Sequence, residues 1–211
     1  MINQINFKNK ASIFLIWLFA ISGVIGISTP AKDWFLALTP LNLLLSLIIM
    51  LWHFKSFNAK VIFALSIPFI LGFVAEALGV NYGLIFGDYI YGENLGFKVL
   101  GVPLMICINW TLLTIATADI AKPRSKNIVI SSLIAAALMT GLDVIIEVSA
   151  PRFDFWAFKN GIVPLQNYIG WFVTAFIAHL GYQFFKVESS KVISWHVLIS
   201  IFLFFSVFLF I

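Results

Sequence analysis

The sequence predicts an all-α fold, namely a polytopic transmembrane helical bundle of about seven helices with two irregular outer loops. Of the 211 residues, 62% are hydrophobic and 10% are charged, whereas soluble domains have about 45–50% apolar and about 25% charged residues. The apolar residues recur in runs long enough to cross a bilayer core about 30 Å thick. Because a mean hydropathy of +1.04 leaves little polar surface, a soluble enzyme is excluded. We expect residues 1–211 to form a single integral membrane domain.

Seven apolar stretches are expected to form the helices, because each is long enough to be interpreted as a membrane span. They lie at roughly residues 12–28, 34–52, 61–80, 102–118, 128–148, 168–185 and 193–211. The first stretch follows Lys8 and Lys10, as the apolar part of a signal peptide would, but Gly26 to Ala31 contains no Ala-x-Ala cleavage site. We therefore expect it to remain as a helix.

The basic residues are divided unevenly between the two sides that alternating spans define. One side holds Lys8, Lys10, Lys55, Lys60, Lys122, Arg124, Lys126, Lys186 and Lys191. The other side holds only Lys32, Lys98, Arg152 and Lys159. Since cytoplasmic loops carry the excess of Lys and Arg, we expect the N-terminus in the cytoplasm and, after seven crossings, the C-terminus outside. The expected location is the bacterial inner membrane.

Most of the acidic residues fall on the expected outer side, in outer loops or in the outer halves of helices. They are Asp33, Glu76, Asp88, Glu93, Asp143, Glu147 and Asp154. For Asp33, Glu93 and Asp154 we favour a simple role in the solubility of the loops. An ionisable group inside a span is costly and usually faces the bundle interior, so function is the default hypothesis for it. Glu76, Asp88, Asp143 and Glu147 are therefore the candidate catalytic residues.

Asp143 and Glu147 are four residues apart, which places both carboxyl groups on one face of their helix. Like-charged neighbours in an apolar setting favour protonation of one another, so one member of such a group is expected to be a neutral acid near neutral pH. General acid catalysis requires such a group. Glu147 has the alternative role of marking the membrane boundary.

The two outer loops carry the most unusual composition. Residues 81–96 include four glycines and three tyrosines, which suits irregular backbone folded against protein at the membrane interface. A weak repeat follows the loops, because Val102-Pro103-Leu104 precedes Trp110 as Val163-Pro164-Leu165 precedes Trp171. Since proline suits the first turn of a helix, each motif is expected to open a helix that runs inward. Chance and a true duplication of helix pairs explain the repeat about equally well.

Several function classes lack the residues that they need. The thirteen Lys and Arg residues, with a net charge of +4, are scattered and form no basic stripe for nucleic acid. Cys107 is the single cysteine, and His53, His179 and His196 are too far apart for a His-rich di-iron site. The chain has no G-x-G-x-x-G and no G-x-x-x-x-G-K-[ST] motif, so dinucleotide and nucleotide phosphate sites have no anchor. We expect no metal and no cofactor.

Two ordered blocks of sequence resemble the CruF-type carotenoid 1,2-hydratase family of integral membrane proteins. The first reads EALGVNYGLIFGDYIY from Glu76 to Tyr91 and continues through Gly101-Val-Pro103 to Trp110. The second combines LDVIIE at 142–147, DFW at 154–156 and IVPLQNYIGW at 162–171. The resemblance covers roughly residues 70–180. It implies the addition of water across the terminal C1=C2 double bond of an acyclic carotenoid end, such as that of lycopene or γ-carotene.

The chemistry of alkene hydration agrees with the residues in these blocks. The reaction needs a strong proton donor, a shielded water and no redox cofactor, and the tertiary cation that forms can be held by aromatic faces within about 6 Å. The candidate substrate-binding residues are Tyr89, Tyr91, Trp110, Trp156, Asn167 and Trp171, of which Asn167 is implied by the family block. Anchoring at the membrane interface is the alternative role of the aromatic residues, and it is favoured for Tyr91 and Trp156. The expected partners are a carotenoid and membrane lipid.

Three other functions remain open on the sequence. A membrane lycopene cyclase uses the same protonation, but an internal double bond captures the cation in place of water. A proton-coupled transporter would explain intramembrane acids and a repeat, although its site typically lies near the bilayer midplane. A non-catalytic scaffold for a pigment pathway would not need converging acids. The oligomeric state does not follow from the sequence.

Overall fold

The computed structural model describes residues 7–211, and the predicted position of the N-terminus itself lies outside this range. In the described part the helices are α1 (Phe7–Ile27), α2 (Lys32–Ala37), α3 (Thr39–Trp52), α4 (Ala59–Tyr82), α5 (Leu104–Ala121), α6 (Ile128–Ser149), α7 (Leu165–Phe184) and α8 (Lys191–Val207). Short 3-10 helices follow α5 and α6, at η1 (Lys122–Arg124) and η2 (Pro151–Phe153). The predicted all-α fold is confirmed.

Each predicted apolar stretch corresponds to a helix, with one correction. The stretch at 34–52 is broken at Leu38 into the short α2 and the longer α3. Pro40 lies in the first turn of α3 and has no N–H to continue a preceding helix, so a new helix begins there. Pro103 and Pro164 directly precede the first residues of α5 and α7, one position earlier than expected.

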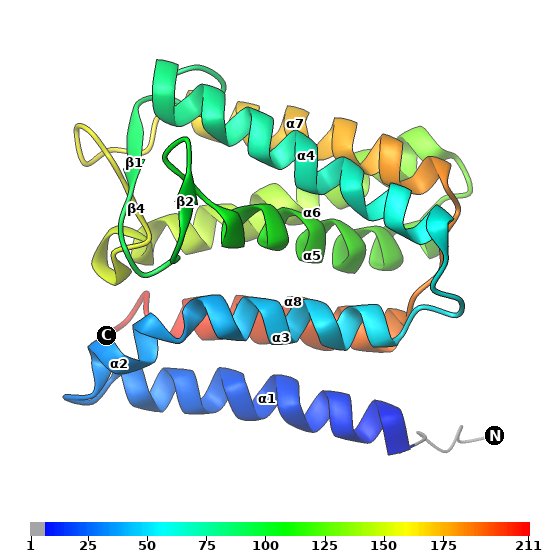
Figure 1. The fold of residues 1–211 in the computed structure, drawn as a ribbon, viewed down its shortest axis with the longest axis horizontal. Helices are drawn as coiled ribbons and strands as arrows, with labels where there is room; N and C mark the ends of the chain where they lie inside the picture. The colour runs from blue at the N-terminus through cyan, green and yellow to red at the C-terminus, as the bar shows by residue number, and fades with distance from the viewer. Residues whose placement is uncertain (1–6) are drawn as a thin grey trace.

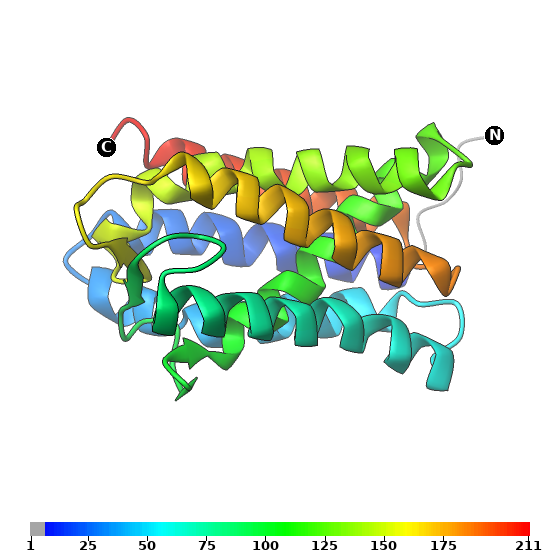
Figure 2. The same ribbon diagram turned by 90° about the horizontal axis from the view of Figure 1, so that it is seen from above.

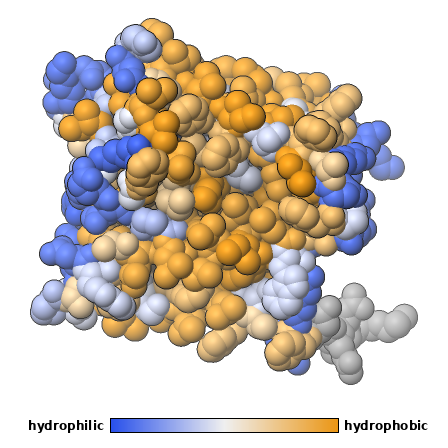
Figure 3. Space-filling model, viewed as in Figure 1, coloured by the Kyte–Doolittle hydropathy of each residue, from blue (hydrophilic) through white to orange (hydrophobic). Residues whose placement is uncertain are grey.

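The hydropathy of the surface is that of a membrane protein. Four helices of the described chain, namely α1, α4, α6 and the segment Leu104–Arg124 that contains α5, are long and apolar enough to cross a bilayer. In Figure 3 a broad hydrophobic band covers the middle of the molecule, and hydrophilic residues gather at its two ends. The chain is therefore an integral membrane protein, as its composition predicts.

Helix α5 occupies the centre of the bundle. Figure 1 shows α4 and α7 on one side of α5 and α6, and α3, α8 and then α1 on the other, and Figure 2 shows α4 and α7 side by side from above. Every residue from Trp110 to Ala121 is buried. Many of these residues are Ala or Thr, and small side chains let membrane helices approach closely.

The connections gather at opposite ends of the bundle. In Figure 1, α1 begins at one end and the chain terminates after α8 at the other. The expected basic end is held together by bonds between distant loops, since Lys55 pairs with Glu188 and Lys122 Nζ donates to the carbonyl of Val187 over 2.9 Å. Which end faces the cytoplasm remains a prediction.

The two outer loops are more regular than expected, because they pair with each other. Strand β1 (Tyr89–Tyr91) runs antiparallel to β4 (Trp156–Phe158), with Tyr91 opposite Trp156. A second small ladder joins β2 (Lys98–Val99) to β3 (Val102–Pro103) just before α5. In β1 the alternation of an extended strand buries Tyr89 and Tyr91 and exposes Ile90. The first loop is thereby held against the second.

Two helical glycines provide a matched test of this packing. A Cβ at Gly170 of α7 would overlap the carbonyl oxygen of Ile85 in the first outer loop, whereas a Cβ at Gly141 of α6 would meet nothing within 4 Å. We expect Gly170→Ala to lower the free energy of unfolding by about 1–3 kcal/mol, the usual cost of overpacking. Gly141→Ala should leave stability unchanged or slightly raised. Thermal unfolding in detergent measures both, and equal melting temperatures would contradict the close approach of α7 to the loop.

Candidate active site

Glu76 is a buried carboxyl group that accepts three hydrogen bonds. It lies in the outer half of α4 with 2% of its surface exposed. Its Oε2 accepts from the hydroxyl of Tyr89 and, over 2.7 Å, from the hydroxyl of Tyr91. Its Oε1 accepts from Trp110 Nε1 over 2.9 Å. Two candidate residues from the outer loop and one from α5 therefore converge on a single acid.

The strand geometry and the glycines of α4 explain this convergence. Tyr89 and Tyr91 are two residues apart in β1 and point to the same side. An added Cβ at Gly79 would lie 2.9 Å from the ring of Tyr89, and one at Gly72 would lie 2.6 Å from the ring of Trp110. The absence of side chains at these positions leaves room for both rings against α4.

The two tyrosines are held in the protonated state that donation requires. Burial, followed by the electrostatic effect of Glu76, raises the pKa of Tyr91 well above its ordinary value. The same two causes raise the pKa of Tyr89. Both hydroxyl groups therefore remain donors to Glu76 across the physiological range of pH. The anchoring role favoured for Tyr91 does not fit this inward position.

Asp143 and Glu147 form a second buried acidic group on α6. Asn167, in the first turn of α7, donates through Nδ2 to Asp143 Oδ2 at 3.1 Å and to Glu147 Oε1 at 2.9 Å. Trp156 Nε1 donates to Glu147 Oε2 at 2.9 Å, so Trp156 also points inward instead of anchoring at the interface. The buried Oδ1 of Asp143 has no hydrogen-bond partner in the described part of the chain.

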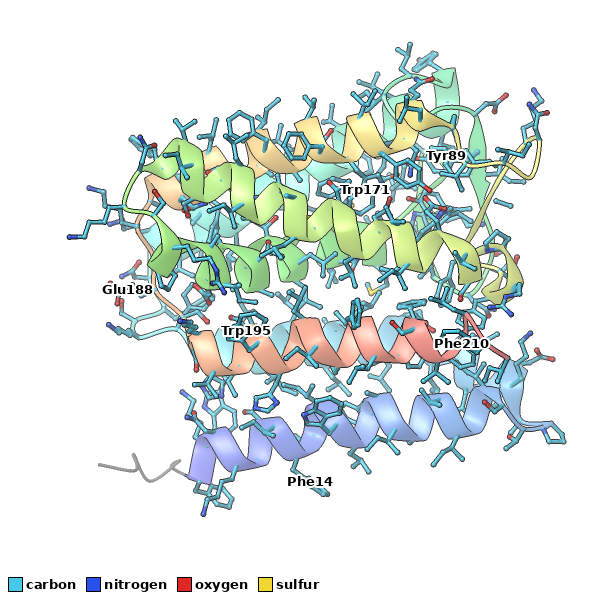
Figure 4. All side chains as sticks on the ribbon, turned by 180° about the vertical axis from the view of Figure 1, so that it is seen from behind. Phe14, Tyr89, Trp171, Glu188, Trp195 and Phe210 are labelled. Atoms are coloured by element: carbon cyan, nitrogen blue, oxygen red, sulfur yellow. The ribbon has the colours of Figure 1, made fainter. Side chains whose placement is uncertain are left out.

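A small cavity of about 20 Å³ lies between the two acidic groups. A space of this size is enough for one water molecule. Its walls include Glu76 of α4, Glu147 of α6, Asn167 of α7 and the rings of Tyr89, Tyr91, Trp156 and Trp171. Among the described residues that line the cavity, none is Lys, Arg or His. Acids from separate helices thus meet at a shared space, at the end of the bundle where Figure 4 shows Tyr89 and Trp171.

The repeated tryptophans stack on each other. The rings of Trp110 and Trp171 are 4.4 Å apart and inclined by 16°, and Phe86 packs against both. Trp171 forms part of the cavity wall. Trp110 does not line the cavity but donates a hydrogen bond through Nε1 to Glu76, which does. The two tryptophans of the repeat are therefore neighbours, and only Trp171 lines the acidic cavity.

Asp88 is the one candidate acid that the structure separates from the others. Its side chain is 58% exposed and forms an ion pair of 2.9 Å with Lys159. Asp88 directly precedes Tyr89, whose side chain points inward, so in an extended segment its own side chain faces the opposite way. The expectation that Asp88 faces the bundle interior with the other candidate acids is wrong.

A larger cavity adjoins the acidic one. It has a volume of about 120 Å³ and lies between α3 and α8 on one side and α5 and α6 on the other. Ile106, Asn109 and Trp156 line both cavities. Asn109 carries only a weak signal in the sequence, because it is an isolated amide next to Trp110 in an apolar helix. In residues 7–211, no three His, Cys, Asp or Glu side chains are grouped so as to hold a metal ion.

Comparison with known proteins agrees with the resemblance found in the sequence. A family described as carotenoid biosynthesis protein matches residues 38–211. Bisanhydrobacterioruberin hydratase of Haloarcula japonica is 27% identical over 120 residues, which cover 52% of this chain and 40% of that protein. The aligned part thus spans less than half of the relative's length, and no solved structure matches. Because the family match covers more than half of the chain, the chain belongs to the carotenoid biosynthesis protein family.

Proposed function

We propose that this protein is a carotenoid 1,2-hydratase, which adds water across the terminal C1=C2 double bond of an acyclic end group such as that of lycopene or γ-carotene. One observation carries the proposal: Glu76 and Glu147, from separate helices, line one small cavity in an aromatic setting. Membership of the family supports a carotenoid as the substrate class. The relative named as a hydratase supports the addition of water.

We infer different roles for the two acidic groups, and their hydrogen bonds support this division. The two tyrosines and Trp110 can all donate to the carboxyl oxygens of Glu76, which supports an ionised carboxylate there. Asp143 and Glu147 instead share one amide, with no cation in the cavity. Two neighbouring buried carboxyl groups resist carrying two negative charges, so one of the pair keeps its proton. Glu147 is therefore the proton donor, because it lines the cavity, and Glu76 is the base.

The reaction follows from these roles. Glu147 transfers its proton to C2 of the end group, and the π electrons of the double bond form the new C–H bond. The tertiary cation left at C1 is stabilised by the carboxylate of Glu76 and by the face of Trp171. A water molecule forms the C1–O bond and releases a proton to Glu76. Return of that proton across the cavity to Glu147 restores the starting state.

The adjoining cavity provides space for the rest of the substrate. Its walls are mostly apolar side chains of α1, α3 and α8 facing α5 and α6. A polyene chain is apolar and extended, and its burial there is favourable. Since Ile106 and Trp156 line both cavities, a chain in the larger one reaches the acidic cavity with its end group.

Amide substitutions test the acidic residues. We expect Glu76→Gln, Asp143→Asn and Glu147→Gln each to lower hydration by about 10²–10⁴-fold, the usual contribution of acid–base catalysis. The matched control is Asp119→Asn, a buried acid that accepts a bond of 2.8 Å from Ser194 far from both cavities. Expression in a bacterium that makes lycopene or γ-carotene, followed by mass analysis of pigments, measures the product at equal protein level.

Two results of that experiment would contradict the assignment. Product without added water would indicate a cyclase, because cyclisation leaves the mass unchanged. If Glu147→Gln hydrates the substrate at the wild-type rate, Glu147 is not the proton donor.

Substitutions of the stacked tryptophans separate a cation-stabilising face from a hydrogen-bond donor. Trp171→Phe keeps an aromatic face and should lower activity modestly, whereas Trp171→Leu should lower it more. Trp110→Phe removes the donor to Glu76 and should cost more than Trp171→Phe. The measurement is hydrated product per folded molecule. Packing alone predicts losses in thermal stability with activity per folded molecule nearly unchanged, and equal activity of Trp171→Phe and Trp171→Leu would exclude the cation-stabilising role.

A further inference from the structure

Asn109 lies on α5 where the two cavities meet, and its side-chain amide is unpaired. Three residues line both cavities: Ile106, Asn109 and Trp156. Ile106 is apolar, and the single polar group of Trp156 already donates to Glu147. The structure gives the amide of Asn109 no hydrogen bond to any residue in the described range 7–211. Among the described residues that line both cavities, Asn109 is thus the one whose side chain has a hydrogen-bond donor and an acceptor that are both unused.

An unpaired amide in a membrane bundle needs a polar partner. Burying an amide without a hydrogen bond costs about 1–3 kcal/mol on protein-based scales, and a water molecule is the smallest group that accepts from its NH₂ and donates to its oxygen. The smaller cavity has room for one water. We infer that the amide and the acidic cavity hold a water molecule together.

Helix α3 carries further polar side chains toward this junction. Thr39, Asn42 and Ser46 follow the spacing of one helix face, and all three line the larger cavity. The side chains of Asn42 and Ser46 also lack hydrogen bonds to described residues. We call Thr39, Asn42 and Ser46 the α3 row. Because α3 begins at the end of the bundle that carries the paired outer loops, the α3 row leads from that end into the larger cavity, which Asn109 also lines.

We propose that Asn109 is the positioning residue that holds the attacking water, which reaches it along the α3 row, and that it thereby directs the cation to hydration. The inference rests on the proposed hydratase function. After proton transfer to C2, water held by Asn109 forms the C–O bond at C1, and its proton passes to Glu76. Without a positioned water, the cation instead loses a proton from a neighbouring carbon and returns to an alkene, with no net change in atoms.

This difference is measurable in heavy water. Protonation followed by proton loss leaves deuterium in the recovered alkene, whereas capture by water gives the alcohol. We expect Asn109→Leu, which is similar in size, to lower the hydrated product by about 10²-fold, the scale of loss when a reactant is misplaced. Deuterium in the recovered alkene should persist or rise. Thr111→Val is the matched control, because Thr111 is buried on the same helix, bonds only to the carbonyl of Cys107 and lines neither cavity.

The smaller substitutions Asn109→Ser and Asn109→Ala give a second comparison that does not depend on the leucine variant folding. Only serine retains a group that binds water, so Asn109→Ser should keep more alcohol relative to deuterated alkene than Asn109→Ala. Equal ratios in this pair would overturn the inference, as would wild-type hydration by Asn109→Leu or a parallel loss of alcohol and deuterium exchange. A wild-type protein that gives neither alcohol nor exchange would instead contradict the proposed function itself.

Discussion

The structure depends on one constraint, which is that the carboxyl group of Glu76 is buried beside a cavity that no Lys, Arg or His of residues 7–211 lines. Three neutral donors satisfy it, and they come from two separate segments, β1 and α5. Loss of one donor would leave a buried acceptor short of a partner, which costs more than an ordinary hydrogen bond contributes. The outer loop and the central helix must therefore both be in place around α4. In the proposed reaction, the positive charge at carbon is the first cation to meet this carboxylate.

The antiparallel pairing of β1 with β4 connects the two acidic groups mechanically. Tyr91 donates to Glu76, and its partner in the ladder, Trp156, donates to Glu147. Two residues that face each other across a strand pair thus hold acids on two different helices. A shift of one strand by one residue would turn its side chain, either Tyr91 or Trp156, away from the cavity. The ladder consequently sets the separation of the acids as well as the shape of the loop.

The sequence predicted the parts of the structure that local patterns determine. Apolar length located the helices, and the cost of an intramembrane charge singled out Glu76 and the Asp143 and Glu147 pair. The prediction for Asp88 was wrong because the side to which its side chain points depends on the strand that begins at Tyr89. That strand forms only by pairing with a segment 67 residues away in the sequence. Asn109 was overlooked because its significance lies in two cavities formed by several helices. Long-range pairing and cavity shape leave no periodic signal along the chain.

The near-complete burial of α5 has a consequence for biogenesis. Part of the surface of α5 is covered by α8, which is synthesised about 70 residues later. Asp119 on α5 accepts a hydrogen bond from Ser194 on α8, so this acid lacks that partner until the ribosome has passed residue 194. Lipid offers a carboxyl group no substitute. Insertion of the helices before α8 therefore cannot complete the centre of the protein, and the nascent chain must hold α5 in a partly assembled state until α8 has been inserted.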